Sequence, residues 1–71
     1  MTKLSVSLSG HLTSISLEPE FIDALRRITA RDNTSMAALI NSIDSARRAG
    51  SNLSSEIRVW IIRRLLQTAE L

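Results

Sequence analysis

The sequence contains no cysteine, and this absence removes two common ways of stabilising a short chain. Without cysteine, the 71 residues form neither a disulfide nor a thiolate metal site. One domain of this length buries only about 60% of its unfolded surface, so a single copy is expected to be marginally stable. The usual remaining route to stability is association, and we therefore expect an oligomer.

Glycine, histidine and aromatic residues are also scarce, which argues against catalysis. Gly10 and Gly50 stand alone, so there is no glycine-rich phosphate loop. His11 is the only imidazole, whereas a metal site needs several such ligands. The many serines have no base to activate them and are expected to serve as caps, turns and strand faces. We expect no catalytic residues, no metal and no cofactor.

The net charge of +2 is mild, and its distribution is more informative than its size. The first 17 residues contain Lys3 and no acid, and the last predicted helix carries Arg58, Arg63 and Arg64. A dimer would repeat these basic edges by symmetry, which is compatible with phosphate contacts. No apolar run approaches the roughly 20 residues that span a bilayer, and no signal pattern opens the chain. We expect a cytoplasmic protein without membrane contact.

The first 17 residues alternate between apolar and polar side chains, which is typical of half-buried strands. The apolar positions are even-numbered up to Leu8 and odd-numbered from Ile15, with Ser9-Gly10 between them. This change fits either a hairpin or one long strand broken by a bulge. A frayed N-terminal arm is the remaining possibility. We favour two strands, over residues 3–9 and 11–17.

The period then changes to that of helices. Pro19 suits a first helical turn and predicts a helix over residues 19–31, ended by Asp32-Asn33. A second helix is predicted over 35–49. The apolar stripes of these helices are Phe21, Leu25 and Ile28, followed by Met36, Leu39, Ile40 and Ile43.

Short polar segments separate the helical patterns. Ser35 or Thr34 caps the second helix, and Gly50 is a fitting stop for it. A third helix is predicted over 53–69, capped by Asn52 or Ser54.

The third predicted helix is apolar on more than one side. One buried face needs only Ile57, Ile61 and Leu65. The additional apolar residues predict burial on a second face, against a partner chain; they are Val59, Ile62 and Leu66. A buried strand through 59–62 is the alternative, but the flanking helix formers argue against it.

The order of strand, proline-initiated helix, polar turn and helix resembles the ribbon-helix-helix fold of Arc/MetJ-type repressors. It is most similar to small bacterial members of that family, and the resemblance covers nearly the whole chain. The matching segments are Thr13-Ser14-Ile15-Ser16-Leu17-Glu18-Pro19-Glu20-Phe21, Ser35 with Ile43-Asp44, and Asn52-Leu53-Ser54-Ser55. Asn33 is a mild departure, because the family commonly has glycine in this turn.

The resemblance implies a homodimer whose paired strands lie as a ribbon in the DNA major groove. If Ile15 and Leu17 face the core, then Leu12, Ser14 and Ser16 face the bases. The family often places Arg, Lys, Asn or Gln here, so weaker base discrimination is expected. The expected phosphate contacts are Ser35, Met36 and Ala37 at the start of the second helix, with Lys3 and His11. The expected dimer core is Ile15, Leu17, Phe21, Leu25, Ile28, Leu39, Ile40, Ile43 and Trp60.

We therefore expect a mainly α, ribbon-helix-helix homodimer with an added N-terminal strand and a third helix, in one domain over 1–71. The expected function is binding of double-stranded DNA as a bacterial transcriptional repressor, with possible further assembly on DNA. The alternative is an interaction module that binds a protein partner through the C-terminal helix, as antitoxin-like members of the superfamily do. A membrane-surface helix ranks third, and an enzyme last.

Overall fold

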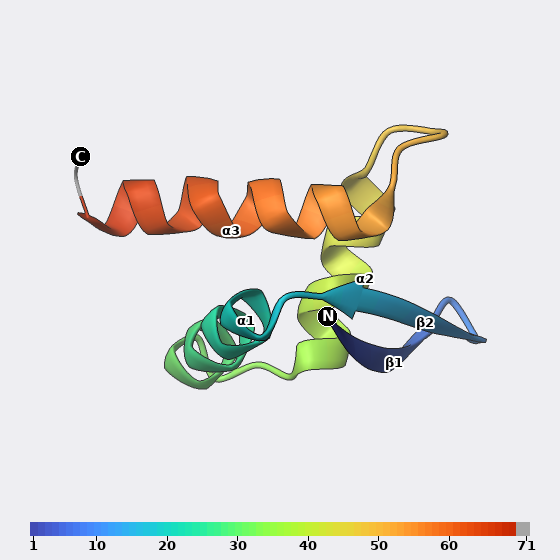
Figure 1. The fold of residues 1–71 in the computed structure, drawn as a ribbon, viewed down its shortest axis with the longest axis horizontal. Helices are drawn as coiled ribbons and strands as arrows, with labels where there is room; N and C mark the ends of the chain where they lie inside the picture. Colours follow the sequence, from blue (N-terminus) through green and yellow to red (C-terminus); the bar gives the residue numbers. More distant parts are fainter. Residues whose placement is uncertain (70–71) are drawn as a thin grey trace.

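The computed structural model describes residues 1–69 and contains a hairpin followed by three helices (Figure 1). The hairpin strands are β1 (Thr2–Leu8) and β2 (His11–Leu17). The helices are α1 (Pro19–Arg31), α2 (Met36–Ala46) and α3 (Leu53–Ala69). The prediction of a mostly helical chain that begins with strands is confirmed, and the pairing of two copies stays a prediction.

The hairpin explains the change from even to odd apolar positions. The strands pair antiparallel from Thr2 opposite Leu17 to Leu8 opposite His11, so even residues of β1 share a face with odd residues of β2. Ser9 and Gly10 form the two-residue turn with φ values of 50° and 85°. Positive φ at both positions is what a type I′ hairpin turn requires. Two strands are therefore confirmed, and the bulged strand and the frayed arm are wrong.

Helix α1 begins and ends as its sequence predicts. Pro19 occupies the first turn. The Glu18 carbonyl accepts hydrogen bonds from the N–H groups of Phe21 and Ile22. At the other end Asn33 takes the left-handed conformation, with φ of 55°. The Thr34 N–H donates to the Thr29 carbonyl at 3.0 Å, which closes a Schellman-type end. Asn33 thus adopts the left-handed conformation for which the family commonly uses glycine.

Helix α2 is shorter than predicted. The Ser35 hydroxyl accepts a hydrogen bond from the Ala38 N–H at 3.0 Å, so Ser35, not Thr34, is the N-cap. The helix ends at Ala46, and the predicted end at residue 49 is wrong. The reason is Arg47, whose backbone is extended and whose guanidinium donates to Asp44 at 2.6 Å.

A short connection leads from α2 into α3. Gly50 lies in this connection with φ of 80°, and not at a helix end. The Asn52 side chain accepts from the Ser55 N–H at 3.1 Å, so Asn52, not Ser54, caps α3.

The core lies between the hairpin and the three helices, and one chain encloses it. Five side chains have at most 1% of their surface exposed: Leu17, Leu25, Ile40, Ile57 and Ile61. They come from β2 and from all three helices, and Figure 1 shows α3 lying across α1 and α2. A lone strand with two helices could not close this core, and α3 supplies the missing side.

Helix α3 is buried on one face only within the single chain. Leu65, expected in the buried stripe, is 45% exposed and lines a hollow of about 400 Å³ beside α1. Val59, Ile62 and Leu66 are similarly exposed, so their expected second burial does not occur within one chain. Residues 59–62 are helical, and the alternative of a buried strand is wrong.

Candidate nucleic-acid interface

The outer face of the hairpin carries the predicted base-contacting residues. Leu12, Ser14 and Ser16 alternate with core residues along β2, and their side chains therefore share the outer face. Leu12 is 80% exposed, Ser14 is exposed and Ser16 is half-buried. The structure brings these three predicted residues together on one surface.

Strand β1 adds three residues to this face, and sequence reasoning identified only one of them. Cross-strand pairing places Lys3 beside Ser16, Ser5 beside Ser14 and Ser7 beside Leu12. Ser5 and Ser7 were missed as site residues. The change in apolar parity could have identified them. A two-residue hairpin places odd residues of β1 on the same face as even residues of β2, so Ser5 and Ser7 must share the face of Leu12 and Ser14.

The outer edge of β1 is partly covered by α2. The Asn41 amide on α2 donates to the Ser7 carbonyl at 2.7 Å and accepts from the Ser9 N–H at 3.3 Å. The Ser7 carbonyl therefore points away from β2. These contacts cap β1 near the turn and leave β2 as the more accessible edge.

The open edge of β2 presents the main-chain groups of the same residues that face outward. In an antiparallel ladder, main-chain groups alternate between pointing at the neighbouring strand and away from it. Ser7 points away from β2, so its partner Leu12 points away from β1, and Ser14 and Ser16 do the same. A groove of about 590 Å³ runs beside this edge, between β2 and the α2–α3 connection. Its lining includes Thr13–Ser16 of β2 and residues 51–54.

The start of α2 has the geometry of an anion site. The Ser35 hydroxyl and carbonyl accept from Ala38 and Leu39, respectively. The N–H groups of Met36 and Ala37 have no hydrogen-bond acceptor within residues 1–69. Unpaired N–H groups at the positive end of a helix dipole favour a phosphate. The role of Ser35, Met36 and Ala37 in DNA binding stays a prediction.

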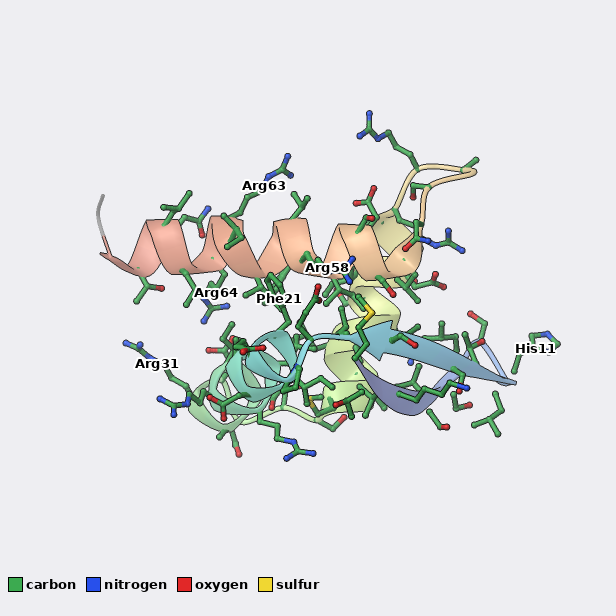
Figure 2. The ribbon with its side chains drawn as sticks, viewed as in Figure 1. His11, Phe21, Arg31, Arg58, Arg63 and Arg64 are labelled. Atoms are coloured by element: carbon green, nitrogen blue, oxygen red, sulfur yellow. The ribbon has the colours of Figure 1, made fainter. Side chains whose placement is uncertain are left out.

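Lys3 and His11 lie on different faces of the hairpin. Lys3 is exposed on the outer face beside Ser16. His11 pairs with the buried Leu8, so its side chain projects from the core-side face at the hairpin tip (Figure 2). Of these two expected phosphate contacts, only Lys3 shares a face with Leu12 and the serines.

Two ion pairs hold α3 against the two ends of α1. The Arg58 Nε donates to the Glu18 carboxylate at 2.9 Å, and the Arg64 guanidinium donates to Asp32 at 2.6 Å. The hydrogen bond from Arg58 holds the pKa of Glu18 below its ordinary value. The hydrogen bond from Arg64 lowers the pKa of Asp32 in the same way and raises that of Arg64.

Each of these arginines also lies over an aromatic ring. Arg58 is 5.9 Å from the Phe21 ring centre, and Arg64 is 5.9 Å from that of Trp60. In Figure 2, Arg58 and Arg64 point from α3 toward α1, whereas Arg63 points away from the rest of the molecule. Both paired arginines therefore serve the packing of α3 and are poor candidates for phosphate contacts.

Other kinds of site receive no support in the described part of the chain. Residues 1–69 contain no cluster of three or more His, Asp or Glu side chains that could hold a metal ion. None of the described helices has the length and apolar character that crossing a bilayer requires.

A short antiparallel hairpin with an exposed polar face, followed by a capped two-helix unit, defines a class of small ribbon-bearing α-helical domains. The chain belongs to the ribbon-helix-helix domain family, whose sequence model matches residues 1–65. The predicted resemblance is thereby confirmed. Members of this family typically bind DNA and are generally not catalysts. No curated protein and no solved structure gives a significant match to the chain.

Proposed function

We propose that this protein binds double-stranded DNA as a homodimeric transcriptional regulator. The observation that carries the proposal is the double role of Leu12, Ser14 and Ser16. Their side chains face outward, and their main-chain groups face the open edge of β2. The main-chain groups of this segment are therefore available to pair with a strand of a second copy, and its side chains are available to contact DNA.

The two β2 strands pair antiparallel about a two-fold axis through Ser14. Ser14 is the midpoint of His11–Leu17, so this register aligns all seven residues of both strands. It places Leu12 of one copy opposite Ser16 of the other, and each Ser14 opposite its counterpart. The result is a four-stranded sheet in the order β1-β2-β2-β1, with its polar face exposed.

The central two strands occupy the major groove. A groove about 12 Å wide accepts a two-stranded ribbon. Serine hydroxyls both donate and accept hydrogen bonds, and Leu12 offers an apolar contact to a thymine methyl. Neither makes the bidentate contacts of arginine or asparagine, so we expect modest sequence preference on a short, roughly palindromic site.

The outer strands lie over the groove walls and contact phosphates. Neighbouring strands are about 4.8 Å apart, which puts the two β1 strands about 14 Å apart and beyond the groove width. Lys3, Ser5 and Ser7 face the DNA from these strands. The first turn of α2, with the free N–H groups of Met36 and Ala37, adds a second phosphate contact.

The half-buried members of the expected dimer core meet the second copy. Phe21, Leu39 and Trp60 pack against the core but keep part of their surface exposed. The other six are already buried within one chain: Ile15, Leu17, Leu25, Ile28, Ile40 and Ile43. In our proposal these six residues do not contact the second copy, and they pack beneath the residues that do.

An interaction module is the second candidate function. The exposed apolar residues of α3 favour it, because Val59, Ile62 and Leu66 form a contiguous unpaired surface. In that case the dimer binds a protein partner through α3, and DNA binding is weak or absent.

Selection from random duplex DNA across a salt series tests the proposal. The test compares the wild type with the Ser14→Ala/Ser16→Ala variant, and with Ser42→Ala/Ser45→Ala as the control for loss of two exposed α2 serines. We expect salt-sensitive binding that enriches a short sequence, kept in the control and lost in the first variant. An absence of binding at low salt contradicts the proposal and favours the interaction module.

A further inference from the structure

The outward face of α3 carries an apolar stripe that nothing within residues 1–69 covers. Val59, Ile62 and Leu66 are spaced by three and four residues and lie opposite the buried pair Ile57 and Ile61. Their exposed fractions are 46%, 48% and 46%. This is the spacing of a helix that pairs with another helix.

Charged residues border the stripe unevenly. Glu56 and Arg63 lie along one flank, one before and one after Val59, and both line a small hollow of about 150 Å³ beside Trp60. Neither makes an ion pair within residues 1–69. Arg58 borders the other flank and is held by Glu18. The flank with Glu56 and Arg63 therefore has one charge of each sign available to a partner.

We propose that the stripe pairs with the same stripe of a second copy, with the two α3 helices antiparallel. When Val59 of one helix packs against Ile62 of the other, Glu56 of each copy lies beside Arg63 of the other copy. The two-fold axis forms this opposite-charge contact twice. The surface is thus complementary to itself, as a symmetric interface requires.

The other ways of pairing these helices bring like charges together. A parallel pair places Arg58 of one helix beside Arg63 of the other on both sides. An antiparallel pair shifted by one heptad, with Ile62 against Leu66, places Arg63 against its own counterpart. Only the register with Val59 against Ile62 joins Glu56 to Arg63, and the flanking charges therefore select it.

The pairing is weak by itself. Stable protein interfaces bury about 1,600 Å² in total, and one helix face with a few half-exposed apolar residues supplies much less. The stripe lies opposite the buried residues Ile57 and Ile61, and the hairpin lies on the buried side of α3 (Figure 1). A single copy can therefore use β2 and α3 at once. If two copies first join through β2, as proposed above, α3 pairing links the resulting dimers into larger assemblies.

Single cysteines introduced into this cysteine-free chain test the geometry directly. A tagged Val59→Cys chain is mixed with an untagged Ile62→Cys chain and oxidised mildly, with Ser45→Cys as the exposed control. We expect the 59–62 disulfide to exceed the 59–59 and 62–62 disulfides several-fold, since the pairing brings these two positions within disulfide reach. Dominant 59–59 and 62–62 products, or yields no higher than with Ser45→Cys, overturn the proposal.

Charge exchange gives a second test that does not depend on DNA binding or on β2. Glu56→Arg alone and Arg63→Glu alone should each shift sedimentation of the concentrated protein toward the smaller species. The double exchange should restore the larger species, because the opposite charges meet again. A double variant no better than either single variant contradicts the α3 contact. The same series leaves DNA binding by a β2 ribbon in place, so failures of the two proposals are distinguishable.

Discussion

Arg58 on α3 donates a hydrogen bond at 2.9 Å to Glu18, the residue that immediately precedes α1. Forty positions separate them in the sequence, and the contact fixes the start of α1 beneath α3. Arg64 and Asp32 repeat the arrangement at the other end of α1. Helix α3 is therefore held to α1 at two points by charge, and the buried Ile61 lies between these points.

Acid should loosen this attachment. The pKa values of Glu18 and Asp32 are lowered in the folded chain, chiefly by hydrogen bonds from Arg58 and Arg64. A carboxyl group with a lowered folded-state pKa contributes stability above its ordinary pKa, and this is lost as pH falls through the folded value. We therefore expect the free energy of unfolding to decrease as the pH drops below the ordinary pKa values of these groups, which are 4.5 for Glu18 and 3.8 for Asp32.

Denaturant titrations at several pH values measure this effect. The Glu18→Gln/Asp32→Asn variant should be less stable than the wild type at neutral pH and should lose less stability in acid. Asp23→Asn is the control, because its partner Arg27 is highly exposed. Equal acid sensitivity of the double variant and the wild type would show that these two ion pairs do not fasten α3.

The two isoleucines of α3 should differ sharply when truncated. Ile57 is fully buried and Ile62 is 48% exposed, although both lie on the same helix. Ile57→Ala removes core contacts and should lower the free energy of unfolding by about 2–5 kcal/mol. Ile62→Ala, measured in dilute protein, should change it by about 0.5 kcal/mol or less. Similar losses for both variants would contradict the packing of α3.

Asn41 should hold the hairpin tip to α2. Asn41→Ala removes the bonds to the Ser7 carbonyl and the Ser9 N–H, and should cost about 1 kcal/mol. Amide exchange at Ser9 should accelerate. Ser42→Ala, at the neighbouring exposed position, should leave that exchange rate unchanged. Unchanged exchange at Ser9 in the Asn41 variant would mean that the edge of β1 is not capped.

Lys3 should contribute to the salt dependence of DNA binding. Each neutralised phosphate adds about 0.9 to the slope of log affinity against log salt. Lys3→Gln should therefore reduce that slope by about two for a dimer, with little change in sequence preference. Arg63→Gln removes the same charge from a side chain that points away from the molecule, and should leave the slope nearly unchanged (Figure 2). Equal effects of both variants would argue against phosphate contacts from β1.

Local features of the fold were predictable from the sequence because they depend on neighbouring residues. Pro19 starts α1, Ser35 caps α2, and Asn33 supplies the left-handed residue between them. The two-residue turn at Ser9-Gly10 fixes which residues share the outer face of the hairpin. The predicted start of α1, the Ser35 cap of α2 and the two-strand arrangement are confirmed.

Features that depend on distant contacts were not predictable. The cap on β1 depends on Asn41, which is 34 positions from Ser7. The early end of α2 is a local exception, because Arg47 binds Asp44 only three positions away and the apolar pattern does not reveal that contact. Periodicity does not show that α3 buries Ile61 yet leaves Leu65 exposed beside a hollow, because that depends on how closely α3 and α1 pack. Periodicity identifies the apolar faces, and packing decides which of them is covered.

The most direct test of the ribbon is a single cysteine at its proposed centre. Ser14→Cys should form a disulfide with its own counterpart in a second copy, because directly opposed strand residues lie about 5.5 Å apart. Ser5→Cys, which shares the outer face on β1, should not, because the two β1 strands lie about 14 Å apart in the proposed sheet. We expect an efficiently linked Ser14→Cys dimer. Linkage no greater than with Ser5→Cys would contradict the ribbon and the mode of DNA binding built on it.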